Sequence, residues 1–313
     1  MATLGVLLKA MLAACGKAIS DIQNVAIVFK EQIGYDPEQL PAPLRGHDGH
    51  DLAVPMKPNK LREIWVEGRP VLNGWCSIGD PFVAETMASM GWDALTIDLQ
   101  HGLICYSEML AMLQAVSASD VTPIVRVSWN APGEIMKALD AGAYGIICPM
   151  VNTRAECEAF VGACRYPPGG YRSFGPTRAA LSAGRGYADE ANDEILTFAM
   201  IETATGLANV NEIVATPGLN AVYVGPSDLS LSMGGKPDQD SQEPALLAAF
   251  DRILAACKAA GVRAGVHTTS AAYSQQMITR GFDLVTVGSD TGYLRTGHRD
   301  AGAMRDFIKA RVG

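Results

Sequence analysis

The sequence predicts an α/β protein built as a (β/α)8 barrel of the TIM type, preceded by an N-terminal extension. Eight apolar, β-branched runs recur between residues 71 and 288, and stretches with helical periodicity separate them. Regular alternation of strands and helices over roughly 240 residues is typical of this barrel. No glycine fingerprint for dinucleotides follows the first run, which favours the barrel over a doubly wound sheet, the second candidate.

The composition is that of an ordinary globular enzyme. Of 313 residues, 48% are hydrophobic and 19% are charged, far from the range of disordered chains. The formal net charge of −8 argues against a nucleic-acid partner, because phosphate binding needs clustered Lys and Arg. The seven cysteines lack zinc-finger or CxxC spacing, which favours free thiols and a cytoplasmic location. No run of 18 apolar residues occurs, so we expect no membrane span.

Residues 1–58 differ in character from the rest and form the predicted N-terminal extension. A helix-like stretch comes first, and residues 35–50 then lack either secondary-structure period and are rich in Pro, Gly and polar residues. We therefore expect a helical segment followed by a linker. The predicted barrel domain covers residues 59–313.

The predicted elements follow one another in the order that a barrel requires. The predicted strands are residues 71–75, 94–98, 123–127, 145–149, 197–202, 221–225, 263–267 and 284–288. The predicted helices include residues 82–90, 107–117, 133–141, 154–165, 243–260 and 271–280. Because the strands of such a barrel are parallel, their carboxyl ends meet at one mouth, where these barrels carry their chemistry.

Charged side chains stand at several of these strand ends. Asp98 and His101 follow the second strand, Arg126 ends the third, Glu202 ends the fifth and Asp228 follows the sixth. An acidic residue at a strand end is often only a helix cap or a turn former. The convergence of five polar residues on one mouth nevertheless favours a catalytic site.

Glu202 and Asp228 lie on adjacent predicted strands and are the predicted metal ligands. Two neighbouring carboxylates repel unless one binds a proton or both bind a cation, and hard divalent cations prefer oxygen ligands. We expect Mg²⁺ or Mn²⁺, with Co²⁺ also possible. Such an ion leaves coordination positions for a 2-oxo acid and stabilises its enolate.

The remaining residues at the mouth predict proton transfer and anion binding. Asp98 could accept one imidazole N–H of His101 and raise its basicity, which would make His101 the base. Arg126 suits an enolate oxygen or a carboxylate, with a structural salt bridge as the alternative.

Two other strand ends receive different interpretations. Gly225, Pro226 and Ser227 lie where a strand turns into a helix, and backbone N–H groups exposed there can bind a substrate carboxylate. His267 ends the seventh strand, and we interpret it as structural or peripheral.

These motifs resemble those of a known family over residues 70–295. The matching segments are residues 97–102 (IDLQHG), 123–127 (PIVRV), 136–143 (MKALDAGA), 148–151 (CPMV), 165–172 (RYPPGGYR), 201–203 (IET) and 225–230 (GPSDLS). The sequence is similar to the metal-dependent (class II) pyruvate aldolases of the 4-hydroxy-2-oxoheptanedioate aldolase and 2-dehydro-3-deoxyglucarate aldolase family.

The resemblance implies a lyase that reversibly cleaves a 4-hydroxy-2-oxo acid to pyruvate and an aldehyde through a metal-bound enolate. A decarboxylase of 2-oxo diacids of the oxaloacetate type, or an enolate-trapping synthase, would use the same site. A barrel that binds a metal and 2-oxo acids without catalysis is the alternative from another class.

The resemblance also assigns residues. It implies Glu202 and Asp228 as metal ligands, Asp98 and His101 as the basic dyad, and Arg126 at the enolate oxygen. It further implies a homohexamer, built as a trimer of dimers with exchanged C-terminal helices.

Within that hexamer, the resemblance implies that Asp140 reaches the site from a neighbouring subunit, whereas the sequence alone favours a helix-end carboxylate. The chain departs from the family at Gln100, where many members carry Glu, and in residues 1–58, which have no counterpart in typical members.

Overall fold

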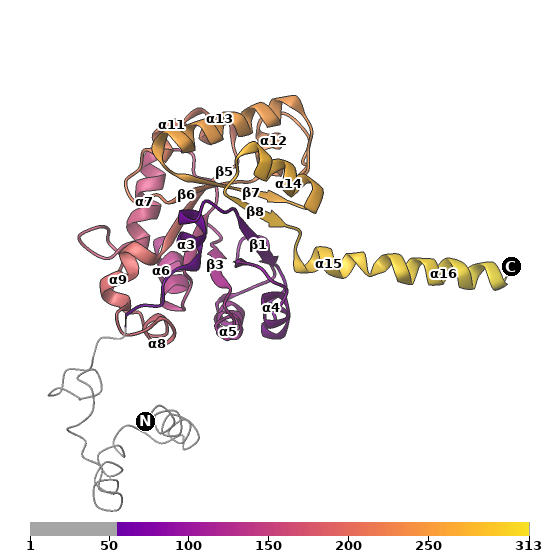
Figure 1. Cartoon of the computed structure of the whole chain (residues 1–313), viewed down its shortest axis with the longest axis horizontal. Coiled ribbons are helices and arrows are strands. Elements are labelled where there is room, and N and C mark those ends of the chain that lie inside the picture. The colour runs from indigo at the N-terminus through magenta and orange to yellow at the C-terminus, as the bar shows by residue number, and fades with distance from the viewer. Residues whose placement is uncertain (1–54, 313) are drawn as a thin grey trace, which may run out of the picture. The chain divides into compact units, whose positions relative to one another are not determined.

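Eight parallel strands close into a barrel in the computed structural model, which describes residues 55–312 (Figure 1). Each strand pairs with the next along the chain, and the first pairs with the last. The strands are β1 (Val71–Cys76), β2 (Ala94–Asp98), β3 (Thr122–Arg126), β4 (Gly145–Cys148), β5 (Leu196–Ile201), β6 (Ala221–Val224), β7 (Arg263–Thr268) and β8 (Leu284–Val287). The predicted (β/α)8 barrel is confirmed, and the closed sheet excludes the doubly wound alternative.

Helices surround the barrel and connect the strands (Figure 1). They are α3 (Lys60–Val66), α4 (Pro81–Ala88), α5 (Tyr106–Val116), α6 (Pro132–Asp140), α7 (Arg154–Cys164), α8 (Ala179–Ala183), α9 (Tyr187–Glu194), α10 (Ala204–Ala208), α11 (Val210–Val214), α12 (Pro226–Ser232), α13 (Pro244–Ala260), α14 (Ala271–Arg280), α15 (Asp290–Thr296) and α16 (His298–Val312). The six helices named from the sequence are present, with ends that differ by at most two residues. The other helices, among them the short α8 and α9 between β4 and β5, were not named from the sequence.

Helix α3 closes the amino-terminal end of the barrel. Asn59 begins it, because its side chain accepts a hydrogen bond from the backbone N–H of Leu61. The Trp65 ring then packs beneath the barrel interior, with its centroid 6.2 Å from that of Phe198. The barrel is therefore packed with side chains at this end, and its free mouth is the carboxyl end.

Strand register brings the two central charged residues together. Asp98 ends β2 and is the direct register partner of Arg126, which ends β3. Strand β5 ends at Ile201, so Glu202 is the first residue beyond it, and Gly225 likewise follows β6. These residues leave adjacent strands at the same level, which places their side chains or backbone groups around one opening.

Only the last residues of the predicted extension belong to the described part of the chain. Met56 is buried, and Lys57 donates its backbone N–H to the carbonyl of Ala183 over 2.6 Å. The carbonyl of Lys57 accepts the hydroxyl of Tyr144 at 3.0 Å. Residues 55–58 thus pack on the barrel, whereas the expectations for residues 1–54 lie outside the described residues. No helix within residues 55–312 is long and apolar enough to cross a membrane.

Two truncations test the role of the extension. Deletion of residues 1–54 should leave the melting temperature unchanged and the expected aldol cleavage within a few-fold, because it keeps residues 55–58 and their described contacts with the barrel. Deletion of residues 1–58 also removes the burial of Met56 and both hydrogen bonds of Lys57, and should lower the melting temperature by a few degrees. Equal loss of stability in both truncations would show that residues 1–54 stabilise the barrel.

Candidate active site

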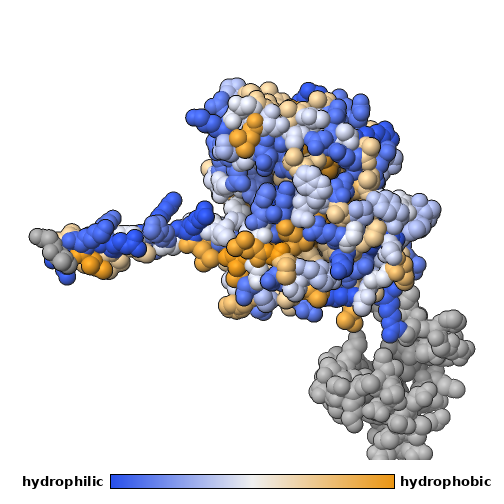
Figure 2. Space-filling model, turned by 180° about the vertical axis from the view of Figure 1, so that it is seen from behind, coloured by the Kyte–Doolittle hydropathy of each residue, from blue (hydrophilic) through white to orange (hydrophobic). Residues whose placement is uncertain are grey.

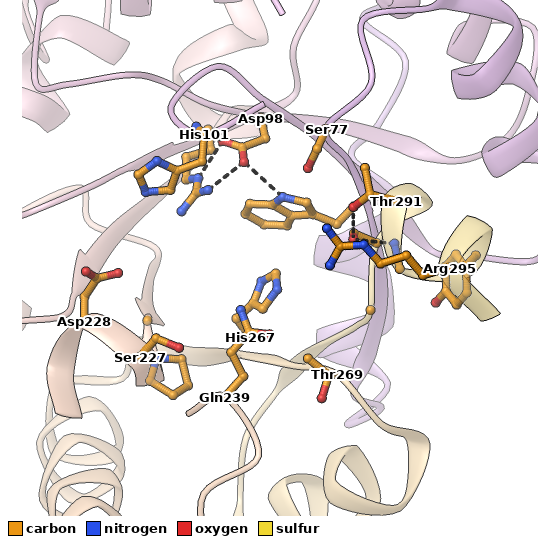
Figure 3. A pocket seen from close by; sticks show the side chains of 18 of the residues that line it. Ser77, Asp98, His101, Ser227, Asp228, Gln239, His267, Thr269, Thr291 and Arg295 are labelled. Atoms are coloured by element: carbon orange, nitrogen blue, oxygen red, sulfur yellow. Dashed lines mark hydrogen bonds and ion pairs between the residues drawn. The ribbon is translucent and has the colours of Figure 1, made fainter. Parts of the chain in front are cut away.

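A cavity of about 520 Å³ opens at the carboxyl ends of the strands. Residues from β1, β2, β3, β5 and β7 and from the segments after β6 and β8 line it, and Figure 3 shows several of their side chains facing one space. The sequence-predicted site residues that line the cavity are Asp98, His101, Arg126, Gly225, Pro226, Ser227 and Asp228. The structure therefore brings seven of the nine predicted residues to one place.

A buried ion pair forms the centre of the site. The guanidinium of Arg126 donates two hydrogen bonds to Asp98, from Nε to Oδ1 at 2.8 Å and from Nη2 to Oδ2 at 2.6 Å. Asp98 is 1% exposed and Arg126 is 8% exposed. Burial alone would raise the pKa of Asp98, but the hydrogen bonds and charge of Arg126 outweigh it and hold that pKa below its usual range. Asp98 is therefore an ionised carboxylate, which accepts hydrogen bonds and donates none.

Trp75, at the end of β1, completes this pair and was not singled out from the sequence. Its indole N–H donates to Asp98 Oδ2 over 3.2 Å, and the guanidinium carbon of Arg126 lies 4.7 Å from its ring centroid. The indole thus contacts both ions, once through a hydrogen bond and once through a cation–π contact. An aromatic residue in an apolar strand predicts core packing, so only its place at a strand end could have indicated this role.

His101 lies in the exposed loop after β2, at the rim of the cavity. The predicted contact between Asp98 and its imidazole differs from the structure. Asp98 Oδ1 instead accepts the backbone N–H groups of His101 at 3.3 Å and Gln100 at 3.0 Å. Because Arg126 and Trp75 take the remaining acceptor positions, the imidazole of His101 makes no hydrogen bond within residues 55–312. Asp98 thus fixes the loop that carries His101 rather than its ring.

Glu202 is buried directly after β5, beside the cavity. Its Oε1 accepts the backbone N–H of Met150 at 2.7 Å, and Met150 has the left-handed φ of 57°. Its Oε2 lies so near Gly225 that a Cβ at that position would come within 2.7 Å of it. Any side chain at Gly225 would therefore collide with this carboxylate.

Asp228 faces the cavity from the first turn of α12 (Figure 3). Burial raises the pKa of Glu202 to about 7, and the negative charge of Asp228 adds to this effect. The charge of Asp228 therefore disfavours the charged form of Glu202, as expected of a carboxylate pair that binds a cation. Within residues 55–312 no cluster of three or more His, Cys, Asp or Glu side chains is arranged to hold a metal, so a cation here would have two protein ligands.

Asp140 does not line the cavity of its own chain. It ends α6 and pairs with Arg172, whose Nη2 donates to Oδ1 over 2.6 Å and whose side chain is fully buried. The Asp140 side chain keeps 27% of its surface exposed. Within one chain, Asp140 therefore belongs to a separate ion pair.

His267, interpreted from the sequence as structural or peripheral, lines the same cavity. Its Nδ1 lies 3.0 Å from the hydroxyl of Tyr223, and its ring meets Trp75 edge-to-face with centroids 4.8 Å apart. Burial, together with the charge of Arg126, lowers its pKa to about 4. His267 is thus a neutral histidine with one face on the site.

A family model and named relatives place the chain among the carbon–carbon lyases of the pyruvate aldolase class. The family model described as HpcH/HpaI aldolase/citrate lyase matches residues 74–296. The chain belongs to this family.

Relatives and solved structures agree with this assignment. The chain is 42% identical over 241 residues to a hydroxypyruvate/pyruvate aldolase of Rhizorhabdus wittichii, which covers 77% of this chain and 96% of the relative. It is 34% identical over 244 residues to a 4-hydroxy-2-oxo-heptane-1,7-dioate aldolase of Salmonella arizonae, covering 76% and 91%. A crystal structure of an HpcH/HpaI aldolase/citrate lyase family protein from Burkholderia cenocepacia superposes with a TM-score of 0.74 at 32% identity, covering 79% of this chain and 99% of that one.

Glu202 should make the stability of the metal-free protein depend on pH. Its carboxyl group loses its proton near pH 7 when folded but near the ordinary 4.5 when unfolded, so the folded state holds more protons between these values. Stability should therefore fall as pH rises from about 5 to about 7. Thermal unfolding of the parent and of Glu202→Gln in the presence of chelator, at pH of about 5 and about 7, measures this effect. The melting temperature of the variant should change less between the two pH values. Equal changes in both proteins would contradict the assignment.

Proposed function

We propose that the chain is a metal-dependent aldolase that reversibly cleaves a 4-hydroxy-2-oxo acid into pyruvate and an aldehyde. The observation that supports it most strongly is the meeting of a carboxylate pair with a buried, Asp98-held Arg126 in one cavity. Cleavage of a 4-hydroxy-2-oxo acid generates an enolate, and these groups can stabilise its negative charge. The names of the relatives support the same reaction.

Glu202 and Asp228 are the residues that would hold the metal. Their donor set consists of carboxylate oxygens, which suits Mg²⁺ or Mn²⁺, and Co²⁺ is also possible. The negative charge of Asp228 raises the pKa of Glu202, which fits a site that needs a cation. When bound, a divalent cation supplies Lewis-acid polarisation of the substrate ketone.

The side chains of this protein account for the other steps. The backbone N–H of Ser227, in the first turn of α12, binds the substrate carboxylate, since Pro226 has no N–H and that of Gly225 donates to the carbonyl of Ile201. His101 accepts the proton of the C4 hydroxyl, the C3–C4 bond breaks, and its electrons form the enolate whose oxygen Arg126 stabilises. Protonation at C3 then gives pyruvate. Asp98 holds Arg126 and the His101 loop in place.

We further infer a homohexamer, a trimer of dimers in which Asp140 completes the site of a neighbouring subunit. Helices α15 and α16 lead away from the barrel (Figure 1). Apolar side chains along α16 are more than half exposed, namely Met304, Phe307 and Ile308, and Figure 2 shows apolar residues along this arm. Exposed apolar surface of this kind suits burial against another copy of the chain.

We infer a cytoplasmic location, which the thiol chemistry supports. The six cysteines within residues 55–312 are free, and five of them are buried. Free thiols persist in a reducing compartment.

Replacement of either carboxylate should weaken metal binding. Glu202→Gln and Asp228→Asn keep the side-chain size but remove a charged ligand, so the Kd for Mg²⁺ or Mn²⁺ should rise steeply, and excess metal should restore part of the rate. Calorimetric metal titration and pyruvate release measure the two effects, and a chelator should silence the parent enzyme. Full activity after exhaustive chelation, or a Schiff base trapped by borohydride, would assign the other aldolase class.

Two variants should separate the base from the enolate stabiliser. Aldol cleavage needs both groups, whereas decarboxylation of oxaloacetate forms the enolate without a base. His101→Ala should therefore slow cleavage by about 10²–10⁴-fold but spare decarboxylation, and Arg126→Ala should slow both by about 10²–10³-fold. Both rates should be measured on both variants.

Arg126→Ala also leaves buried Asp98 without its partner, so its melting temperature must be recorded with the rates. Equal loss of both reactions in His101→Ala, or unimpaired decarboxylation in Arg126→Ala, would show that the roles are assigned wrongly.

A further inference from the structure

A line of hydrogen-bonded side chains crosses the interior of the barrel and ends at His267. Asn73 Nδ2 lies 2.8 Å from the hydroxyl oxygen of Thr286, which lies 2.7 Å from the hydroxyl of Tyr223. That hydroxyl lies 3.0 Å from Nδ1 of His267. Asn73, Thr286 and Tyr223 are each 0% exposed, so only the last member of the line reaches the cavity. The proposed reaction leaves this arrangement without a role.

The line has a direction, and Asn73 sets it. An amide nitrogen only donates, so the Thr286 oxygen accepts there, and Tyr223 is the one acceptor within residues 55–312 that the Thr286 hydroxyl proton reaches. The Tyr223 oxygen accepts that proton, so the phenol donates to Nδ1 of His267. A neutral imidazole that accepts at Nδ1 carries its proton on Nε2. The barrel interior therefore selects one tautomer of His267.

The charge and surroundings of His267 agree with this tautomer. Burial, together with the positive charge of Arg126, lowers its pKa to about 4, so the ring is neutral near pH 7. The edge-to-face contact with Trp75 fixes the ring plane. No group within residues 55–312 bonds Nε2, and Figure 3 shows His267 facing the cavity. A neutral N–H donor of fixed direction therefore lies free in the site.

The substrate half that this donor meets follows from the arrangement of the mouth. The 2-oxo acid half is bound, in the proposed function, by groups that follow β3, β5 and β6. His267 lies near the end of β7, and Thr269, Thr291 and the cation Arg295 share the remaining part of the cavity lining with it. The oxygens still without partners there belong to the aldehyde half. A neutral donor suits an uncharged oxygen, since an anionic group would gain more from a cation.

We propose that His267 is a substrate-binding residue whose neutral Nε2–H donates to an uncharged oxygen, carbonyl or hydroxyl, of the aldehyde half of the substrate. Tyr223 and Thr286 are positioning residues that hold the donating tautomer. The identity of the ligand rests on the proposed aldolase function, whereas the tautomer does not. Hydroxylated aldehydes are the acceptor class that this side of the cavity fits.

Nitrogen NMR of histidine-labelled protein tests the tautomer without any turnover. We expect a neutral His267 with its proton on Nε2 at pH 7, identified by loss of its signals in His267→Gln. In Tyr223→Phe the phenol donor is gone, and a mixture of the two tautomers should replace the single one. An imidazolium at pH 7, or a proton on Nδ1 in the parent protein, would overturn the proposal.

Two substitutions at the same position test the donor in binding. The Gln amide nitrogen can occupy the place of Nε2, whereas the shorter Asn reaches only the place of Nδ1. His267→Asn should therefore raise the KM for the aldehyde roughly tenfold, the value of one lost hydrogen bond, and His267→Gln should change it much less. Unfolding curves of both variants show whether each remains folded.

Glyceraldehyde and propionaldehyde, each with pyruvate and metal, identify the bound oxygen. If His267→Asn raises the KM for both aldehydes, the bound oxygen is the carbonyl oxygen. If it raises the KM for glyceraldehyde alone, the bound oxygen is a hydroxyl. The proposal would be overturned if His267→Asn kept the parent KM for both aldehydes, or if His267→Asn and His267→Gln raised the KM equally. Failure of the parent enzyme to turn over either aldehyde would instead count against the aldolase function, while the NMR result would still stand.

Discussion

The buried pair of Asp98 and Arg126 is the interaction on which the rest of the site depends. It joins the ends of two adjacent strands through register, and the same carboxylate fixes Trp75 and the loop that carries His101. Removal of one partner from such a pair costs about 3–5 kcal/mol, because the other charge remains buried without compensation. Neither residue can therefore be replaced alone without a loss of stability. The position of His101 depends on the hydrogen bond from its backbone N–H to Asp98, not on a contact of its ring.

Strand ends made most of this site predictable from the sequence. Parallel strands end at one level, so the charged residues at those ends converge whatever the details of the loops. Glu202, Asp228 and Arg126 were found in this way, and the cavity contains or adjoins all three. The predicted contact between Asp98 and the ring of His101 is not formed, because the loop conformation decides which group of His101 meets the carboxylate. In the structure that loop turns its backbone N–H groups to the carboxylate.

The sequence pattern did not indicate several other features of the structure. The sequence pattern predicts core packing for Trp75 and Tyr223. Only the fold shows that the indole N–H of Trp75 bonds Asp98 and that the Tyr223 hydroxyl bonds His267. The short helices α8 and α9 have too few turns for a helical period to stand out. Asp140 illustrates a further limit, since one chain places it in an ion pair with Arg172 and only an assembly could bring it to a site.

Met150 has a consequence for how a cation is recognised with so few protein ligands. A residue other than glycine in the left-handed region costs of order 1 kcal/mol, and here that conformation directs an N–H toward Glu202. This hydrogen bond orients the carboxylate, and the absence of a side chain at Gly225 leaves the space that its Oε2 occupies. An incoming ion therefore meets a ligand that has little rotational freedom left to lose. In the proposed metal site, one ligand is therefore oriented by the backbone of Met150, a residue whose own side chain takes no part in binding.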